Sequence, residues 1–247
     1  MRIWLALALA LAATALPSLA RADVTWRVAE LRREQCMSGA LYEPEVAIEG
    51  CTHLIRARFA SSGDRAEAFK RRGDHYRRLG QYADALADYT QAISNRADYT
   101  AALYRRSQVF LELGDYAQAD RDAARVVELA PETPGGHRVR CQAAAMGALD
   151  LDAGHVSCNA ALALEPDEPE TLAARGLIAL RRNDHDSAWR DFDDALRGAG
   201  DNAHYRYGRG VAALRLGQDA QGRADLAAAM HHDENVAATF AGYGITP

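Results

Sequence analysis

Two consecutive stretches decide the fold: AEAFKRRGDHYRRLGQYADALADYTQAISNRADY (66–99) and TAALYRRSQVFLELGDYAQADRDAARVVELAPET (100–133). They align without a gap at a spacing of 34 residues. Gly80-Gln81-Tyr82 recurs as Gly114-Asp115-Tyr116, and the matches around it are Phe69/Leu103, Tyr76/Phe110, Ala85/Ala119 and Asp88-Tyr89/Asp122-Ala123. Self-similarity at this period is typical of stacked helical hairpins, so the sequence predicts an all-α fold.

These residues resemble the pattern of the tetratricopeptide repeat (TPR) family. That pattern has a large residue at position four, a small one at eight, an aromatic at eleven and then a turn glycine. Small residues at positions twenty and twenty-seven, an aromatic at twenty-four and a closing proline follow. The resemblance implies a right-handed α-solenoid of helical hairpins, which is a scaffold and not in itself an activity.

The repeat register divides the chain into a signal segment, a repeat array and a cap. Residues 23–65 read as a degenerate N-terminal hairpin, with helices over 28–37 and 45–57 and a break at Ser61-Ser62-Gly63. Five repeats are expected at 66–99, 100–133, 134–168, 169–202 and 203–236, the third with one extra residue near Gly147-Ala148. Residues 237–247 read as a C-terminal helix stub and tail that cap the open face of the last repeat.

Small side chains recur where the two helices of a hairpin would touch, and they allow the close approach that interdigitated packing needs. The eighth positions are Gly73, Ser107, Cys141, Gly176 and Gly210. The twentieth positions are Ala85, Ala119, Gly154, Ala188 and Gly222, and the twenty-seventh are Ala92, Val126, Ala161, Ala195 and Ala229.

A second regularity concerns charge. The seventh position is arginine in every repeat, namely Arg72, Arg106, Arg140, Arg175 and Arg209. Sixteen residues later stand Asp88, Asp122, Asp191 and Asp225, with Ser157 in the third repeat. We expect arginine–aspartate pairs between helices, either within one hairpin or between neighbours.

The N-terminus has the features of a cleavable secretory signal. Met1-Arg2 precedes an uncharged run from Ile3 to Leu16, and Ala20 and Ala22 form an A-x-A exit. We therefore expect removal of residues 1–22 and export to the bacterial periplasm or beyond. The alternative is an uncleaved anchor, for which the apolar run is short.

Charge limits the class of partner. Without residues 1–22, which include Arg2 and Arg21, the chain keeps 27 basic and 34 acidic residues and a net charge of −7. This acidic balance argues against nucleic acid or an anionic membrane surface as the main partner. No later stretch is apolar enough to predict stable membrane insertion.

The four cysteines allow three pairings in an oxidising compartment. The TPR register implies one of them, because Cys141 and Cys158 take the eighth and twenty-fourth positions of one repeat, which face each other across the hairpin. Cys36 and Cys51 stand in nearly the same relation. We expect disulfides Cys36–Cys51 and Cys141–Cys158. A four-thiol metal site is the alternative, but no C-x-x-C spacing occurs.

Catalytic motifs are missing from the sequence. It contains no G-x-S-x-G, no G-x-x-x-x-G-K-[ST] and no H-E-x-x-H. His231-His232-Asp233-Glu234 offers metal-binding side chains, but its place at a helix end favours a solvated surface. We expect no catalytic residue, no metal and no cofactor.

In the TPR family the first helix of each hairpin lines a groove. The residues expected to bind a partner there are Lys70, Arg77, Tyr104, Arg105, Gln108, Arg138, Gln142, Leu177, Tyr207 and Val211. This line runs from basic and polar to apolar, which suits an extended or helical peptide with an acidic and a hydrophobic part. The alternative is that the C-terminal tail or a neighbouring helix fills the apolar half.

One TPR subclass grips a C-terminal carboxylate with a set of lysine, asparagine and arginine residues. Lys70 matches that set, whereas Asp74, Arg105, Gly135 and Val139 do not. The prediction is therefore a non-catalytic interaction scaffold or adaptor of the periplasm with a protein or peptide partner. An accessory subunit of an envelope enzyme or secretion machine is the alternative. A cell-wall hydrolase is a third and would need a carboxylate pair in the groove.

Overall fold

The computed structural model describes residues 26–38, 41–58 and 60–247, and the expected signal segment lies outside them. Within these ranges every regular element is a helix and no strand occurs. The chain divides after Tyr99 into two compact units, Met1–Tyr99 (unit 1) and Thr100–Pro247 (unit 2), which are treated one at a time. The all-α fold of helical hairpins predicted from the repeat is confirmed.

Unit 1 contains two hairpins. Residues 26–37 are helical, and α2 (Pro44–Arg56), α3 (Ser62–Arg78) and α4 (Tyr82–Asn95) follow. The expected break before the first repeat is instead a helix start. Ser61 accepts a hydrogen bond from the main-chain nitrogen of Asp64, and the Asp64 carboxylate accepts one from the main-chain nitrogen of Ser61. This reciprocal capping box explains why α3 begins inside the Ser-Ser-Gly sequence.

Unit 2 contains four hairpins and a short final helix. They are α5 (Thr100–Glu112), α6 (Tyr116–Leu129), α7 (Pro134–Gly147), α8 (Leu151–Leu164), α9 (Pro169–Arg181), α10 (His185–Ala199), α11 (Ala203–Arg215), α12 (Asp219–His232) and α13 (Val236–Gly242). Pro134 and Pro169 stand at first helical positions, where the missing N–H costs nothing. Asn202 caps α11 by accepting from the main-chain nitrogens of His204 and Tyr205.

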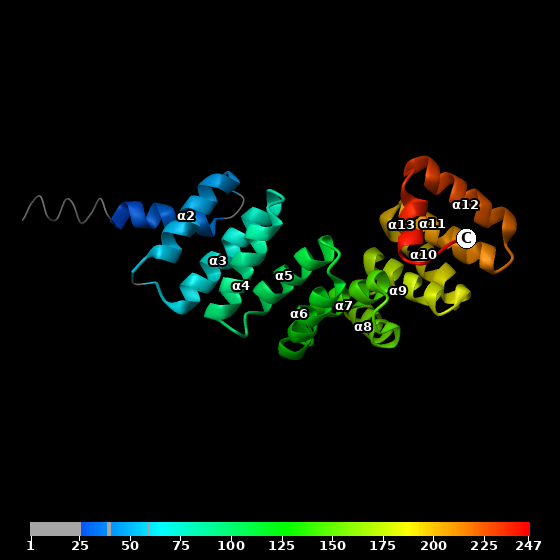
Figure 1. Cartoon of the computed structure of the whole chain (residues 1–247), viewed down its shortest axis with the longest axis horizontal. Helices are drawn as coiled ribbons and strands as arrows, with labels where there is room; N and C mark the ends of the chain where they lie inside the picture. Colours follow the sequence, from blue (N-terminus) through cyan, green and yellow to red (C-terminus); the bar gives the residue numbers. More distant parts are fainter. Residues whose placement is uncertain (1–25, 39–40, 59) are drawn as a thin grey trace, which may run out of the picture. The chain divides into compact units, whose positions relative to one another are not determined.

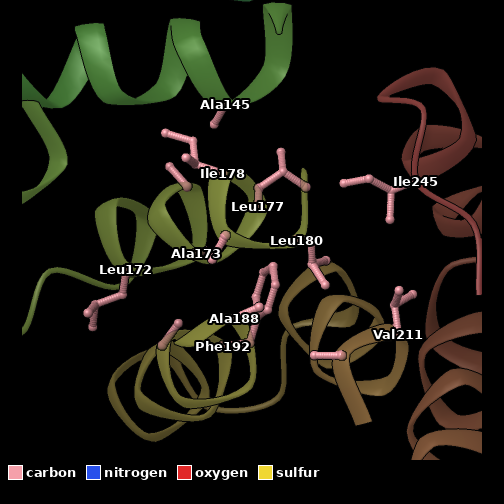
Figure 2. Close-up of a cluster of buried hydrophobic side chains, with 14 of the residues drawn as sticks. Ala145, Leu172, Ala173, Leu177, Ile178, Leu180, Ala188, Phe192, Val211 and Ile245 are labelled. Carbon is pink, nitrogen blue, oxygen red and sulfur yellow. The ribbon is translucent and has the colours of Figure 1, made fainter. Parts of the chain in front are cut away.

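The hairpins of unit 2 stack so that their first helices form an inner layer (Figure 1). α5 packs against α7, α7 against α9, and α9 against α11, whereas the described second helices make no comparable contacts with one another. The largest core cluster runs from Cys141 to Ile245 and centres on α9, where Leu177, Ile178 and Leu180 are buried (Figure 2). The faces of α5, α7, α9 and α11 that point away from the second helices are called the inner face of unit 2.

The predicted arginine–aspartate pairs are confirmed, and they lie within hairpins. Each arginine donates through two nitrogens to both carboxylate oxygens, with N–O distances of 2.7–2.9 Å, in Arg72–Asp88, Arg106–Asp122, Arg175–Asp191 and Arg209–Asp225. All four carboxylates are buried. This parallel geometry fixes the rotation of one helix against the other.

Several of these arginines also reach back to the preceding hairpin. The remaining guanidinium nitrogen donates from Arg72 to Thr52 at 2.8 Å, from Arg175 to Asn159 at 2.9 Å and from Arg209 to Asp193 at 2.6 Å. Arg140 faces Ser157 instead of an aspartate, and its Nε donates to Asp120 of the preceding hairpin at 2.9 Å. Arg72, Arg175 and Arg209 thus each join three helices, whereas Arg140 joins two.

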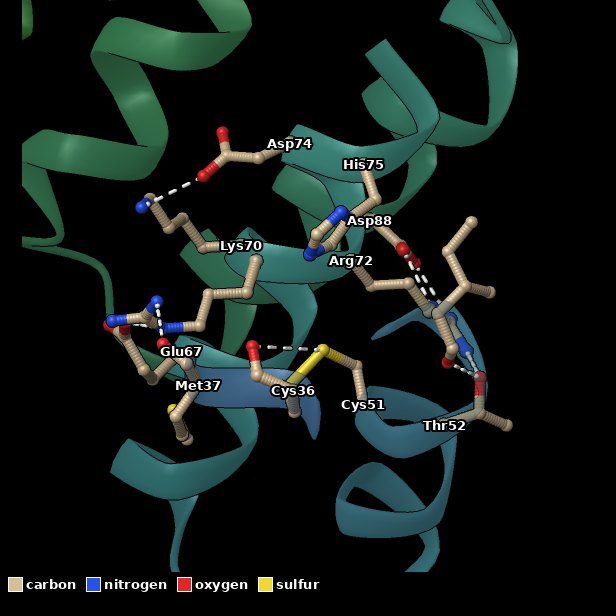
Figure 3. The surroundings of a disulfide bond; sticks show 12 residues. Cys36, Met37, Cys51, Thr52, Glu67, Lys70, Arg72, Asp74, His75 and Asp88 are labelled. Carbon is tan, nitrogen blue, oxygen red and sulfur yellow. Dashed lines mark hydrogen bonds and ion pairs between the residues drawn. A yellow bond between two sulfur atoms is a disulfide. The ribbon is translucent and has the colours of Figure 1, made fainter. Parts of the chain in front are cut away.

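The structure joins Cys36 to Cys51 and Cys141 to Cys158. Figure 3 shows the first disulfide beside the Arg72–Asp88 pair, which belongs to the next hairpin. In the first and fourth repeats the same two positions hold a glycine and an aromatic ring, Gly73 with Tyr89 and Gly176 with Phe192. A Cβ at Gly73 would lie 2.8 Å from the Tyr89 ring. In the third repeat a disulfide therefore takes the place of the glycine–aromatic contact seen in the first and fourth repeats.

The extra residue of the third repeat lies one step beyond the expected place. Gly80, Gly114 and Gly217 adopt left-handed backbone at the turn, and Ala148 adopts it at φ 49° in the third repeat. In the other turns the next residue is the N-cap, whereas here Leu149 intervenes before the cap, Asp150. Leu149 packs against both neighbouring core clusters, so the extra side chain contributes to each of them.

Candidate functional site

The N-terminal half of the inner face of unit 2 is a connected polar surface. Tyr104 on α5 lies over α7 at Gly135, where a Cβ would come within 2.9 Å of its ring. Its hydroxyl accepts a hydrogen bond from Gln108 at 3.0 Å, and Gln108 accepts one from Arg105 at 3.0 Å. Three predicted partner-binding residues are therefore in mutual contact.

Arg138 extends this surface onto α7. Its guanidinium lies 3.4 Å from the Tyr104 hydroxyl and pairs with Glu165 at 3.1 Å. Burial by itself would lower the pKa of Arg138. The hydrogen bond to Tyr104 and the charges of Glu168 and Glu165 outweigh it, so the pKa lies above its ordinary value. Arg138 is thus a positively charged group held in a fixed position, and its hydrogen-bond donors are only partly used.

Gln142 marks the change from polar to apolar surface. It lies one helical turn after Arg138 on α7 and donates to Glu170 on α9 at 3.3 Å. Both side chains stand at the edge of an apolar pocket of ≈ 230 Å³. The pocket is lined by Gln142, Ala145, Met146, Glu170, Ala173, Ala174, Leu177, Phe192, His204, Tyr205, Phe240 and Tyr243.

Five helices, α7, α9, α10, α11 and α13, contribute to this pocket, and its lining is almost wholly hydrocarbon. Met146 comes from α7, Leu177 from α9, Phe192 from α10, Tyr205 from α11 and Phe240 from α13. Burial raises the pKa of Tyr205 to about 12, and the nearby Glu170 and Glu168 act in the same direction. A hollow of this size and polarity accepts one large apolar side chain.

Tyr207 and Val211 do not lie on a free surface, which corrects their assignment as partner-binding residues. Tyr207 is 3% exposed and packs against Phe240 of α13, with ring centroids 4.7 Å apart and the rings tilted by 46°. Val211 is fully buried in the core cluster that also contains Ile245. The C-terminal segment fills this part of the groove, as the alternative interpretation expected, because its apolar side chains cover the end of the stack.

Lys70 and Arg77 belong to unit 1 and are placed on α3. Lys70 pairs with Asp74 one turn later at 2.9 Å, and Asp74 also accepts from the Tyr89 hydroxyl at 2.9 Å. Arg77 is half-buried. The predicted line from Lys70 to Leu177 is therefore observed only from Tyr104 onward, within unit 2.

Two arginines that the sequence did not single out lie at the ends of α9 and α11. Arg181 donates to the main-chain oxygen of Met146 at 3.3 Å, and Arg215 donates to that of Leu180 at 3.3 Å. Both therefore cap the preceding first helix. They occupy the thirteenth position of successive repeats, so the repeat register was the signal that would have identified them.

The described residues contain no group of three or more histidine, cysteine, aspartate or glutamate side chains that could hold a metal ion. None of the helices in these ranges has the length and hydrophobicity needed to cross a bilayer. At the end of α12, His232 lies 3.3 Å from Asp201 across the hairpin.

Comparison with curated proteins finds a relative in DnaJ homolog subfamily C member 3 from Gallus gallus. It is 29% identical over 163 residues, which cover 61% of this chain. The chain spans 32% of that relative's length. The likeness therefore concerns a portion of a longer protein.

Solved structures show the same architecture. A tetratricopeptide repeat protein from Parabacteroides merdae superimposes with a TM-score of 0.66 and 17% identity, over 86% of this chain and 92% of that one. YrrB, described as a TPR protein with an unusual peptide-binding site, gives a TM-score of 0.61 and 14% identity, over 81% and 100%. At these identities the likeness concerns the fold alone. The profile of the tetratricopeptide repeat matches residues 70–136 and 173–233, and the chain belongs to this family.

Proposed function

We propose that this chain is a non-catalytic adaptor that holds a segment of another protein on the inner face of unit 2. The observation that carries the proposal is the continuity of that face, from the polar network at Tyr104 and Arg138 to the apolar pocket at Leu177. A surface with fixed donors at one end and a hydrophobic hollow at the other suits an amphipathic peptide.

Membership of a repeat family and a structural neighbour described as peptide-binding support this proposal. Repeat hairpins expose a long face relative to their mass, because each hairpin contacts only its neighbours. In unit 2 the pocket is formed by residues from several hairpins, so binding there depends on the stack and not on one repeat.

We further propose that the adaptor works in the bacterial periplasm after loss of residues 1–22. The signal-like N-terminus and the two disulfides support this location, since disulfides persist in oxidising compartments. Sequencing the N-terminus of the protein recovered from a periplasmic fraction should yield Asp23 as the first residue. Recovery of the uncleaved chain in the cytoplasm would contradict the proposal.

Site-specific photo-crosslinking in cells tests the binding face. A photoreactive residue in place of Gln142 should capture a partner, because Gln142 stands between the polar network and the pocket. The matched control replaces Val156, which is 67% exposed on the second helix α8. Equal capture from both positions, or none from Gln142, would rule out this face as the binding site.

A further inference from the structure

The C-terminal tail shows how the inner face of unit 2 holds an extended segment. Beyond α13, Ile245 is 2% exposed and lies in the core cluster with Leu180 and Val211 (Figure 2). The main-chain oxygen of the next residue, Thr246, accepts a hydrogen bond from Arg215 at 2.9 Å. An apolar side chain is thus seated among the helices while an arginine binds the oxygen that follows it.

Arg181 occupies the same place one repeat earlier. Each of the two arginines donates to a carbonyl 35 residues before it, near the end of the preceding first helix. Met146, the acceptor for Arg181, also lines the apolar pocket beside Leu177. At Arg215 a second nitrogen holds the tail, whereas the Nε of Arg181 is buried and has no hydrogen-bond partner in the described part of the chain.

The charge of Arg181 is also uncompensated. Among the described residues it forms no ion pair, whereas its neighbour Arg182 pairs with Asp152 at 3.1 Å. Burial lowers the pKa of the Arg181 guanidinium, and only Tyr243 acts in the opposite direction. A carboxylate brought against this guanidinium would compensate its charge and accept charge-assisted hydrogen bonds from it.

We propose that the pocket beside Leu177 and the guanidinium of Arg181 together bind an extended peptide that carries a large apolar side chain directly followed by a carboxylate. The tail residues Ile245 and Thr246 are the internal precedent for this arrangement, displaced by one repeat. The carboxylate comes either from an aspartate or glutamate side chain or from the end of a peptide chain. This inference rests on the proposed function and specifies its ligand.

Selection from a random peptide library on the purified chain, followed by synthesis of an enriched peptide, tests the inference. We expect enriched sequences to contain isoleucine, leucine or phenylalanine directly before an acidic residue or a free C-terminus. Replacing the apolar residue by serine, or the carboxylate by an amide, should weaken binding by at least about 10-fold, the change expected for ~1.4 kcal/mol. Side-chain amides and C-terminal amides, made separately, identify which carboxylate is bound.

Variants of the protein provide the second arm. Arg181→Glu should weaken the acidic peptide at least about 10-fold and favour a peptide with lysine in place of the acidic residue. Arg182→Glu makes the same charge change one residue later, at an arginine already paired with Asp152, and should leave affinity unchanged. Melting temperatures establish that both variants are folded.

The outcomes separate the two proposals. Enriched peptides without an apolar–acidic pair, or equal losses in Arg181→Glu and Arg182→Glu, would overturn this inference and leave the adaptor function standing. Failure to enrich any peptide, together with no capture from the Gln142 position, would overturn both. Binding of a second copy of the chain through its own C-terminus would support the carboxylate chemistry and identify the partner as the protein itself.

Discussion

Arg209 donates two parallel hydrogen bonds to Asp225, each of 2.8 Å, from the first helix of its hairpin to the second. The Asp225 carboxylate is 5% exposed, and Gln221 donates to it as well at 3.2 Å. Buried charges in such pairs depend strongly on each other, because a lone buried carboxylate loses its hydration without compensation.

Replacing Arg209 by methionine should therefore lower the free energy of unfolding by about 3 kcal/mol. Combining it with Asp225→Leu should restore much of the loss, since the buried carboxylate is removed as well. Asp193, the second acceptor of Arg209, is 24% exposed and keeps its ion pair with Arg197. Arg223→Met serves as the control, because the Arg223 side chain on α12 is 69% exposed. This substitution should change the free energy of unfolding by less than ~1 kcal/mol. Urea denaturation measures all three. A loss in Arg209→Met no greater than in the control would contradict the structural role of the pair.

The Cys141–Cys158 disulfide closes a short loop, since its two cysteines are separated by 17 positions in the sequence. Replacing both cysteines by alanine should lower the free energy of unfolding by about 3 kcal/mol. The neighbouring hairpin has Gly176 and Phe192 at the same repeat positions. Cys141→Gly combined with Cys158→Phe should therefore recover stability relative to the double alanine variant and remove its dependence on reductant. Thermal melts with and without dithiothreitol distinguish these results.

Gly208 is required by the ring of Phe192. A Cβ at this position would lie 2.4 Å from the ring, which leaves no room for a methyl group. Gly208→Ala should lower stability by about 1–3 kcal/mol through overpacking. Gly242→Ala, where nothing lies within 4 Å, should cause no loss. The overpacking explanation predicts a smaller penalty when Phe192 is leucine, and an unchanged penalty in that background would disprove it.

His75 should make unit 1 sensitive to acid. Burial lowers the pKa of His75 below its ordinary value of 6.5, and the charge of Arg78 acts in the same direction, with Asp74 opposing. The unfolded chain therefore takes up this proton at a higher pH than the folded chain. The contribution to stability is full above pH 6.5 and is lost as the pH falls below that value.

His75→Gln should accordingly flatten the fall in the free energy of unfolding between neutral and mildly acidic pH. Circular dichroism during urea titration at pH 7 and pH 5 measures the difference. Identical differences in the variant and the unsubstituted chain would show that His75 does not cause the acid sensitivity.

The repeat made much of the fold predictable, because position-specific chemistry recurs in several copies. Arg175 and Asp191 were expected to pair, and Cys141 was expected to face Cys158, because the same register serves every hairpin. The sequence did not indicate the reach of Arg175 to Asn159, since no fixed residue type occupies the accepting position. Contacts between hairpins therefore had to be observed.

The binding face was less predictable, because its C-terminal part depends on a segment without a repeat counterpart. Tyr207 follows the consensus spacing of groove residues, yet Phe240 covers it. The 34-residue pattern ends with the last repeat, so it carries no information on where the residues that follow fold back. The role of Arg181 could not be predicted for a different reason, because an arginine at a helix end is also typical of a solvated surface.

In the hairpin of α7 and α8, the arginine–aspartate contact and the disulfide link different pairs of helices. Arg140 binds Asp120 of α6, and in the described part of the chain it has no aspartate partner on α8. There, Ser157 donates to the carbonyl of Ala153 on its own helix. α7 is therefore tied backward while α8 is tied to α7 through sulfur. After reduction of the Cys141–Cys158 disulfide, the least stable contact in unit 2 would lie between the two helices of one repeat. The amide protons of α8 would then exchange with deuterium before those of α7.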